Sequence, residues 1–112
     1  MFSTSVTVDL AANTKTANLL SGDINEFTQT DSLINVYGVV SATNDIRMTV
    51  IADSVIAIDD KVIPFIGTTI DKSAHLVDSF RVFAGTRLAI FLRNTTATAT
   101  TDIVVGVEVL PL

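Results

Sequence analysis

The sequence predicts an all-β fold, an antiparallel β-sandwich of about eight strands in one domain that spans residues 1–112. Three observations carry this prediction. Apolar residues alternate with polar ones in several short segments, which is the period of a half-buried strand. Turn-forming residues recur between these segments, as in sandwiches and barrels. No stretch provides the long crossover helices that a parallel sheet requires.

The first half of the chain contains three predicted strands, one loop and one weak strand. Residues 2–10 alternate strictly, so one face would carry Phe2, Thr4, Val6, Val8 and Leu10. Residues 11–23 are rich in Asn, Ser and Gly and are expected to form a loop. Residues 24–30 predict a weak short strand, whereas 32–40 and 46–52 predict stronger ones. In 46–52, Arg47 and Thr49 would share a solvent-exposed face.

The middle of the chain predicts a hairpin followed by an ambiguous segment. Residues 54–58 continue the β-rich composition, and the polar run 59–61 is expected to form the tip of the hairpin. Residues 62–68 would return as the second strand, at an edge or a bulge because they contain Pro64. Residues 70–80 are compatible with a helical turn, although Leu76–Phe83 also fit a strand.

Two strong strands end the chain. In 85–94, the apolar residues Leu88, Ile90 and Leu92 are expected to point inward. Residues 95–101, the run TTATATT, would form a long hairpin tip or an extended edge, and 102–112 predict the last strand. A jelly roll is preferred over an immunoglobulin-like sandwich, because the first and last strands of a jelly roll can both lie within the sheets. The Cys and Trp landmarks of immunoglobulin domains are also missing.

Composition restricts the functional classes. The net charge is −5 and no basic arm is present, which argues against direct contact with nucleic acid. No apolar run is long enough for membrane insertion, and residues 2–10 lack the pattern of a secretory leader, so synthesis and retention in a cytoplasm are expected. Charged residues form 17% of the chain, against about 25% in an average soluble domain. Low charge fits either an assembly unit or a well-packed domain with a threonine-rich exterior.

No residue pattern indicates catalysis, a cofactor or a metal, and the chain is not expected to be an enzyme. His75 is the only histidine, with Asp71 and Asp78 as its nearest acidic neighbours, and no nucleophile elbow accompanies it. Asp59 and Asp60 suit a turn better than a calcium site. The only glutamates are Glu26 and Glu108, and nothing marks either as a glycosidase acid. The triplet at Asn94 matches a glycosylation acceptor, with chance as the better explanation.

Six residues are candidates for a protein interface. Arg87, Phe91 and Arg93 are expected on the outer face of one strand, where an aromatic ring between two arginines is typical of contact patches. The competing interpretation is a solvated strand face whose arginines pair with acidic neighbours. Leu33, Tyr37 and Val39 are expected on the second, partly apolar face of residues 32–40.

The single-domain β pattern, the low charge, the loop NTTATATTD and the ending GVEVLPL together resemble small single jelly-roll structural proteins of bacteriophage virions, of the minor capsid, vertex or head-decoration type. The resemblance covers the whole chain as a pattern, without a diagnostic motif. It implies localisation in the virion, self-association into trimers or pentamers, and docking on other capsid proteins. The alternative is a non-catalytic carbohydrate- or ligand-binding β-sandwich, which would stack exposed aromatic rings on a sugar; the absence of Trp and the single Tyr count against it.

Overall fold

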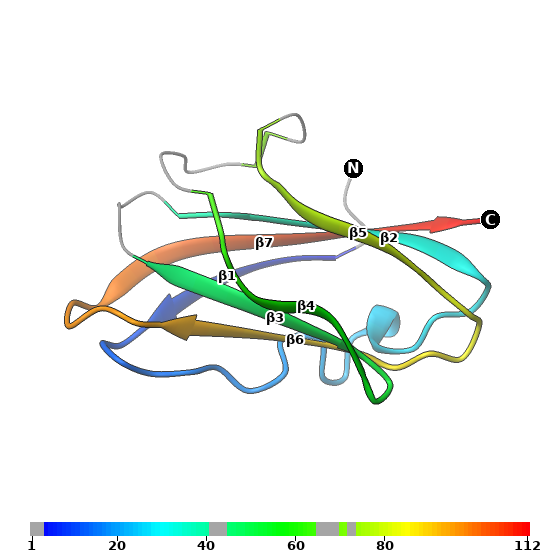
Figure 1. Cartoon of the computed structure of the whole chain (residues 1–112), viewed down its shortest axis with the longest axis horizontal. Coiled ribbons are helices and arrows are strands. Elements are labelled where there is room, and N and C mark those ends of the chain that lie inside the picture. Colours follow the sequence, from blue (N-terminus) through cyan, green and yellow to red (C-terminus); the bar gives the residue numbers. More distant parts are fainter. Residues whose placement is uncertain (1–3, 41–44, 65–69, 72–73) are drawn as a thin grey trace.

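The computed structural model of the chain describes residues 4–40, 45–64, 70–71 and 74–112 (Figure 1). These residues form seven strands and one short 3-10 helix. The strands are β1 (Thr4–Leu10), β2 (Ser32–Val39), β3 (Ile46–Ala52), β4 (Val55–Val62), β5 (Leu76–Val82), β6 (Leu88–Asn94) and β7 (Thr100–Pro111), and the helix is η1 (Ile24–Glu26). The predicted positions Phe2 and 65–68 lie outside the described residues.

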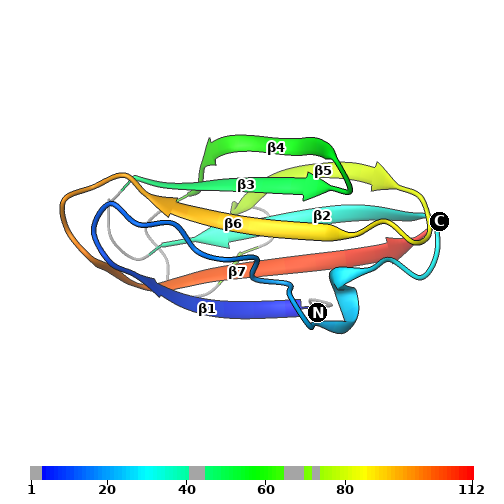
Figure 2. The ribbon, with the colours of Figure 1, turned by 90° about the horizontal axis from the view of Figure 1, so that it is seen from below.

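The strands form two antiparallel sheets that face each other, which confirms the predicted antiparallel β-sandwich (Figure 2). One sheet has four strands in the order β1-β7-β2-β5, and the other has three in the order β4-β3-β6. The total solvent-accessible surface is 5775 Å². A compact folded chain of this mass is expected to expose about 5,900 Å². The two sheets therefore bury as much surface as an independently folded domain of this size.

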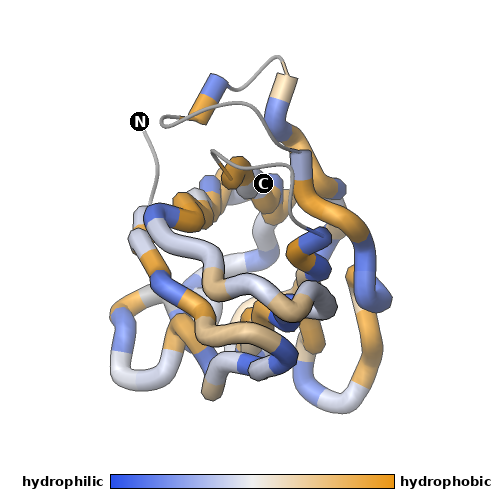
Figure 3. Tube along the Cα trace, turned by 90° about the vertical axis from the view of Figure 1, so that its left-hand side faces the viewer, coloured by the Kyte–Doolittle hydropathy of each residue, from blue (hydrophilic) through white to orange (hydrophobic). Residues whose placement is uncertain are grey.

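The core lies between the sheets and is built by alternation along the strands. In β6 the inward residues Leu88, Ile90 and Leu92 are buried, as predicted, whereas the residues between them face outward. Figure 3, which looks along the sandwich, shows the same alternation of hydrophobic and hydrophilic residues along the tube. Each strand therefore supplies one apolar stripe, and the two sheets bury their stripes against each other.

The strand pairs are nested around the turn between β3 and β4. These two strands pair with each other, β2 pairs with β5, and β1 pairs with β7. Residues 14–19 lie along β6 and are joined to it by a bridge between Lys15 and Arg93. In the order of nesting, this pair comes between β2–β5 and β1–β7. The N–H of Thr16 donates to the Leu92 carbonyl at 2.9 Å, and the N–H of Leu92 donates back to Thr16 Oγ1 at 3.0 Å. We call residues 14–19 the edge segment, because it covers the free edge of β6.

Two predicted elements are wrong. Residues 24–30 do not form a strand, because the N–H of Glu26 bonds to the Asp23 carbonyl in η1 and only Phe27 makes a single bridge, to Arg87. Residues 59–61 are not a hairpin tip either. They lie within β4, where a register shift and the positive φ of Asp60, 48°, form a bulge opposite Thr49.

The turn of this hairpin lies instead at residues 53–54, between β3 and β4. Asp53 adopts a left-handed φ of 56° there, a conformation that Asp tolerates better than most residues. Of the ambiguous segment, Leu76–Val82 is strand β5, which settles the choice in favour of a strand for these residues. The described residues therefore form seven strands plus the edge segment, against the eight or so that were expected.

Candidate interaction surfaces

Phe91 and Arg93 lie on the outer face of the three-stranded sheet, as the alternation predicts, and the exposed Arg87 directly precedes β6; we call these three residues the sheet-face patch. Phe91 is half-buried, lies opposite Thr49 of β3, and has the ammonium group of Lys15 5.0 Å from the centre of its ring. A cation at this distance is attracted by the negative face of an aromatic ring. The ring is therefore partly covered by the edge segment.

Both arginines of the sheet-face patch are paired with carboxylates of the same chain. Arg93 donates to Asp60 through Nε, at 3.2 Å, and through Nη2. This hydrogen-bonded pairing holds the pKa of Asp60 below its usual value and raises the pKa of Arg93. At the other end of β6, Arg87 Nε donates to Glu26 Oε2 at 2.9 Å.

The pKa values of Glu26 and of one further carboxyl group, Asp45, are lowered as well. The pKa of Glu26 is lowered, first by the hydrogen bond from the Gly22 N–H and then by the Arg87 guanidinium. The pKa of Asp45 is lowered, first by the Thr95 hydroxyl and then by Arg47. The acidic neighbours foreseen in the competing interpretation of this face are thus present. Their pairing leaves the sheet-face patch close to neutral.

Two of the predicted interface residues on β2 are not accessible. Tyr37 is 5% exposed and Val39 is fully buried, so the expectation of an uncovered second face is wrong at these positions. β2 lies between β7 and β5, and the Tyr37 hydroxyl donates to Glu108 Oε1 at 3.3 Å. Both faces of this end of the strand are buried, whereas Leu33 and Asn35 at its other end are only half-buried.

The other residues singled out in the sequence have structural surroundings. His75 is buried, and its Nδ1 accepts the Asp71 N–H at 2.9 Å in the turn that precedes β5. Asp78 lies 3.8 Å from Lys61 Nζ, and Asp59 is exposed on β4. Asn94 is fully buried and its side-chain nitrogen bonds to backbone carbonyls, which leaves no room for a glycan on the folded chain.

Large exposed apolar side chains gather at one end of the sandwich, which strand alternation did not indicate. This end holds η1, the β3–β4 turn, the β5–β6 loop and the last residue of the chain (Figures 1 and 2). We call its exposed apolar side chains the apolar end: Ile24 (80% exposed), Phe27 (49%), Val55 (66%), Phe83 (80%) and Leu112 (69%). Clustered apolar exposure of this kind marks interaction sites in folded proteins.

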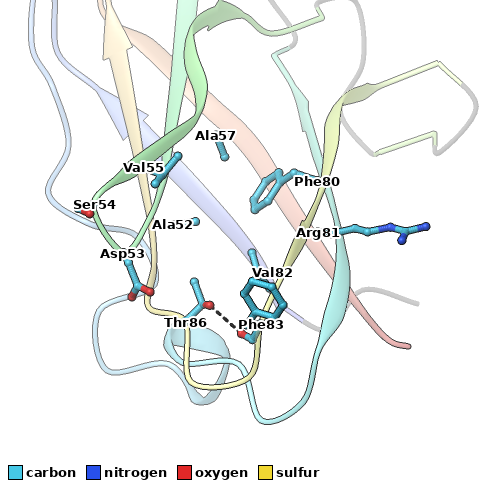
Figure 4. A pocket seen from close by; sticks show the side chains of 10 residues that line it. All are labelled: Ala52, Asp53, Ser54, Val55, Ala57, Phe80, Arg81, Val82, Phe83 and Thr86. Carbon is cyan, nitrogen blue, oxygen red and sulfur yellow. Dashed lines mark hydrogen bonds between the residues drawn. The ribbon is translucent and has the colours of Figure 1, made fainter.

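A cleft of about 470 Å³ opens at the apolar end, between the β3–β4 hairpin and β5 (Figure 4). Val55 and Ala57 line it from β4, while Phe80 and Val82 line it from β5, and Phe83 stands at its mouth. We call this hollow the end cleft. Asp53 lies on one rim and Arg81 on the opposite one, where its side chain points away from the cleft in Figure 4. The end cleft is therefore apolar inside, with one charge of each sign at its rims.

The apolar end could be found from sequence only in part. Ile24 and Phe27 stand in the weak strand predicted for 24–30, and Phe83 ends the ambiguous segment, so none of the three has an assigned inner face. A phenylalanine directly before Ala84 and Gly85 is the clearest signal, since a glycine at that point favours a bend in the chain. That these loops meet at one end depends on the topology of the sandwich.

Comparison of the chain with models of protein families, with curated proteins and with solved structures finds no match in any of the three. Within the described part of the chain, no helix has the length and apolar character needed to cross a membrane. The same residues contain no group of three or more His, Cys, Asp or Glu side chains placed to hold a metal ion.

Proposed function

We propose that this protein is a non-catalytic structural subunit of a virion, of the minor capsid, vertex or head-decoration type, which associates with copies of itself and docks on a capsid shell. The observation that carries the proposal is the apolar end, where five large apolar side chains are between 49% and 80% exposed. A domain that buries its own core this completely gains nothing from such exposure, whereas an assembly unit covers it with a neighbour.

The strand pairing supports a jelly-roll topology for this subunit. A jelly roll arises when one long antiparallel hairpin is rolled up, so that its strand pairs are nested from the central turn to the two chain ends. β3–β4, β2–β5, the edge segment with β6, and β1–β7 have this nesting. The edge segment then stands where an eighth strand belongs, and we assign the fold to the jelly rolls rather than to the immunoglobulin-like sandwiches.

We assign two roles to the two exposed surfaces. The apolar end makes the contact between copies, in the trimers or pentamers that the resemblance to phage proteins implies. The sheet-face patch meets the shell proteins, with Phe91 as its apolar centre and the two paired arginines as its rim. A hydrophobic centre with a polar rim is the usual anatomy of a stable protein interface.

Multi-angle light scattering over a wide concentration range tests the first role. We expect a mass that is a small multiple of 11.9 kDa, with the fold unchanged by circular dichroism. A mass of one chain at every concentration would overturn the proposal. In the virus that encodes the protein, we expect it to co-sediment with intact particles, and Phe91→Asp to abolish this co-sedimentation while self-association persists.

The end cleft also favours a second candidate, a ligand-binding sandwich. Its volume of about 470 Å³ falls within the roughly 300–1,000 Å³ range of small-molecule sites, and two phenylalanines line it. Asp53 at its rim provides a hydrogen-bond acceptor of the kind a sugar uses. Screening against a panel of oligosaccharides by ligand-detected NMR tests this function, and signal loss in Phe80→Ala would place the ligand in the cleft.

A further inference from the structure

We infer that the apolar end binds a second copy of this chain, with Phe83 of one copy seated in the end cleft of the next. This inference rests on the proposed assembly function and names the contact that performs it. The protruding ring, the hollow that receives it and two opposite charges all belong to the same end of the molecule.

Phe83 is held in place before any partner arrives. Its carbonyl accepts hydrogen bonds from the hydroxyls of Thr28, at 2.8 Å, and Thr86, at 2.7 Å. The following residues are tied down as well, since the Ala84 N–H donates to Asp31 Oδ1 at 2.9 Å and the Gly85 N–H to the Thr28 carbonyl at 2.7 Å. A side chain on a fixed backbone loses little conformational freedom on binding, which favours association. The ring is nevertheless 80% exposed.

The end cleft matches this ring in size and chemistry. Its interior is apolar, and Phe80 turns its ring toward the hollow (Figure 4). An incoming phenyl ring would therefore meet Phe80 and the Phe83 of the receiving copy. Offset or edge-to-face aromatic pairs add stability beyond the area that they bury.

The charges at the rims favour a copy of this chain over an unrelated protein. Among the described residues, Arg81 forms no ion pair, and no cationic side chain pairs with the Asp53 carboxylate, which accepts the Arg87 N–H at 2.9 Å. When Phe83 of one copy enters the cleft of another, the Arg81 rim of the first approaches the Asp53 rim of the second. One surface thus carries both halves of an electrostatic match.

A stable interface takes about 800 Å² from each partner, which is about one seventh of the 5775 Å² that the chain exposes. The apolar end concentrates five large exposed apolar side chains, so a contact there has few charges to desolvate.

The first experiment compares Phe83→Asp with Phe91→Asp, a matched change on the other candidate surface. We expect Phe83→Asp to raise the dissociation constant measured by sedimentation velocity at least ~30-fold, the loss typical of a central anchor residue, and Phe91→Asp to change it less than about threefold, within the range for exposed rim positions. Association that survives Phe83→Asp but not Phe91→Asp would overturn the inference and leave the proposed function standing. A monomeric wild type would overturn both.

A second experiment reads the geometry directly. The chain contains no cysteine, so single-cysteine variants report contacts between copies without background. We expect a mixture of Arg81→Cys and Asp53→Cys to form a disulfide-linked dimer faster than either variant alone. Thr101→Cys, an exposed position away from the apolar end, serves as the control partner for each. Equal cross-linking with the control would overturn the inference even if the protein is oligomeric.

Discussion

Asn94 organises the end of the sandwich opposite the apolar end, and its replacement gives the sharpest test of the fold. The side chain is fully buried at the end of β6. Its nitrogen donates to the Thr98 carbonyl at 3.0 Å and, at longer distances, to the carbonyls of Leu10 and Ala11. Its oxygen accepts the N–H of Thr96 at 2.9 Å and the Thr96 hydroxyl at 2.6 Å. One amide thus joins β6, the β6–β7 loop and the end of β1.

Asn94→Ala removes three short hydrogen bonds and takes a partner from the part-buried N–H of Thr96. Each bond contributes about 0.5–1.5 kcal/mol, and an unsatisfied buried group costs ~1–3 kcal/mol. We therefore expect the free energy of unfolding to fall by about 2–4 kcal/mol. Asn94→Asp is expected to cost more at neutral pH, because a carboxylate cannot donate to the surrounding carbonyl oxygens and its charge is buried among them.

Urea unfolding at 25 °C measures both effects. The midpoint should fall with an unchanged m-value. In the Asn94→Asp variant, burial raises the pKa of the introduced carboxyl in the folded state above its unfolded value. The extra cost of Asn94→Asp over Asn94→Ala is therefore complete above the folded pKa and disappears as the pH falls below it. A loss under about 1 kcal/mol in Asn94→Ala would refute the assignment, since that is the effect of an exposed polar residue.

Two glycine positions and one set of three carboxylates give three further predictions. Gly38→Ala should destabilise by ~1 kcal/mol in thermal unfolding and Gly38→Val by more, because a Cβ there would meet Ile63 Cγ2 and Met48 Cε at 3.3 Å. Gly85→Ala should cost about 1–2 kcal/mol for its φ of 80°, with no clash to relieve. The pKa values of Glu26, Asp45 and Asp60 are lowered in the folded state, so each carboxylate stabilises the fold. This contribution to the free energy of unfolding is complete above the unfolded pKa values, 4.5 for Glu and 3.8 for Asp, and is lost as the pH falls below them. The triple variant Glu26→Gln, Asp45→Asn, Asp60→Asn removes these charges, so its free energy of unfolding should depend less on pH in this acidic range.

The strands were predictable wherever alternation and burial agree. In β6 and β7 every inward apolar residue except Val109 is buried, because each strand has one face on the core and one toward solvent. β2 did not follow this rule. Tyr37 and Val39 are buried although the alternation places them outward, and what covers the outer face of a strand cannot be obtained from the strand's own sequence.

Turns and bulges were less predictable, because the same residue types serve several backbone shapes. The polar run at 59–61 has the composition of a hairpin tip, yet Asp60 forms a bulge inside β4 and pairs with Arg93 from across β3. Asp53, with the same left-handed φ region, forms the actual turn. The difference lies in the partners that each carboxylate reaches, and these come from strands distant in the sequence.

The way in which the strand edges are covered explains why association would use side chains at one end rather than strand pairing. The edge segment occupies the edge of β6 with main-chain hydrogen bonds, and Lys61 Nζ reaches from β4 to the Val77 carbonyl of β5 at 2.9 Å. When sheets of different molecules pair through their edges, open aggregates form. Charged and covered edges suppress this pairing. With the edge of β6 covered and Lys61 at the edge of β4, the apolar end is the part of the described surface where a neighbour gains most. A contact at one end, with the protruding ring and the cleft side by side, favours a small closed assembly over a fibre.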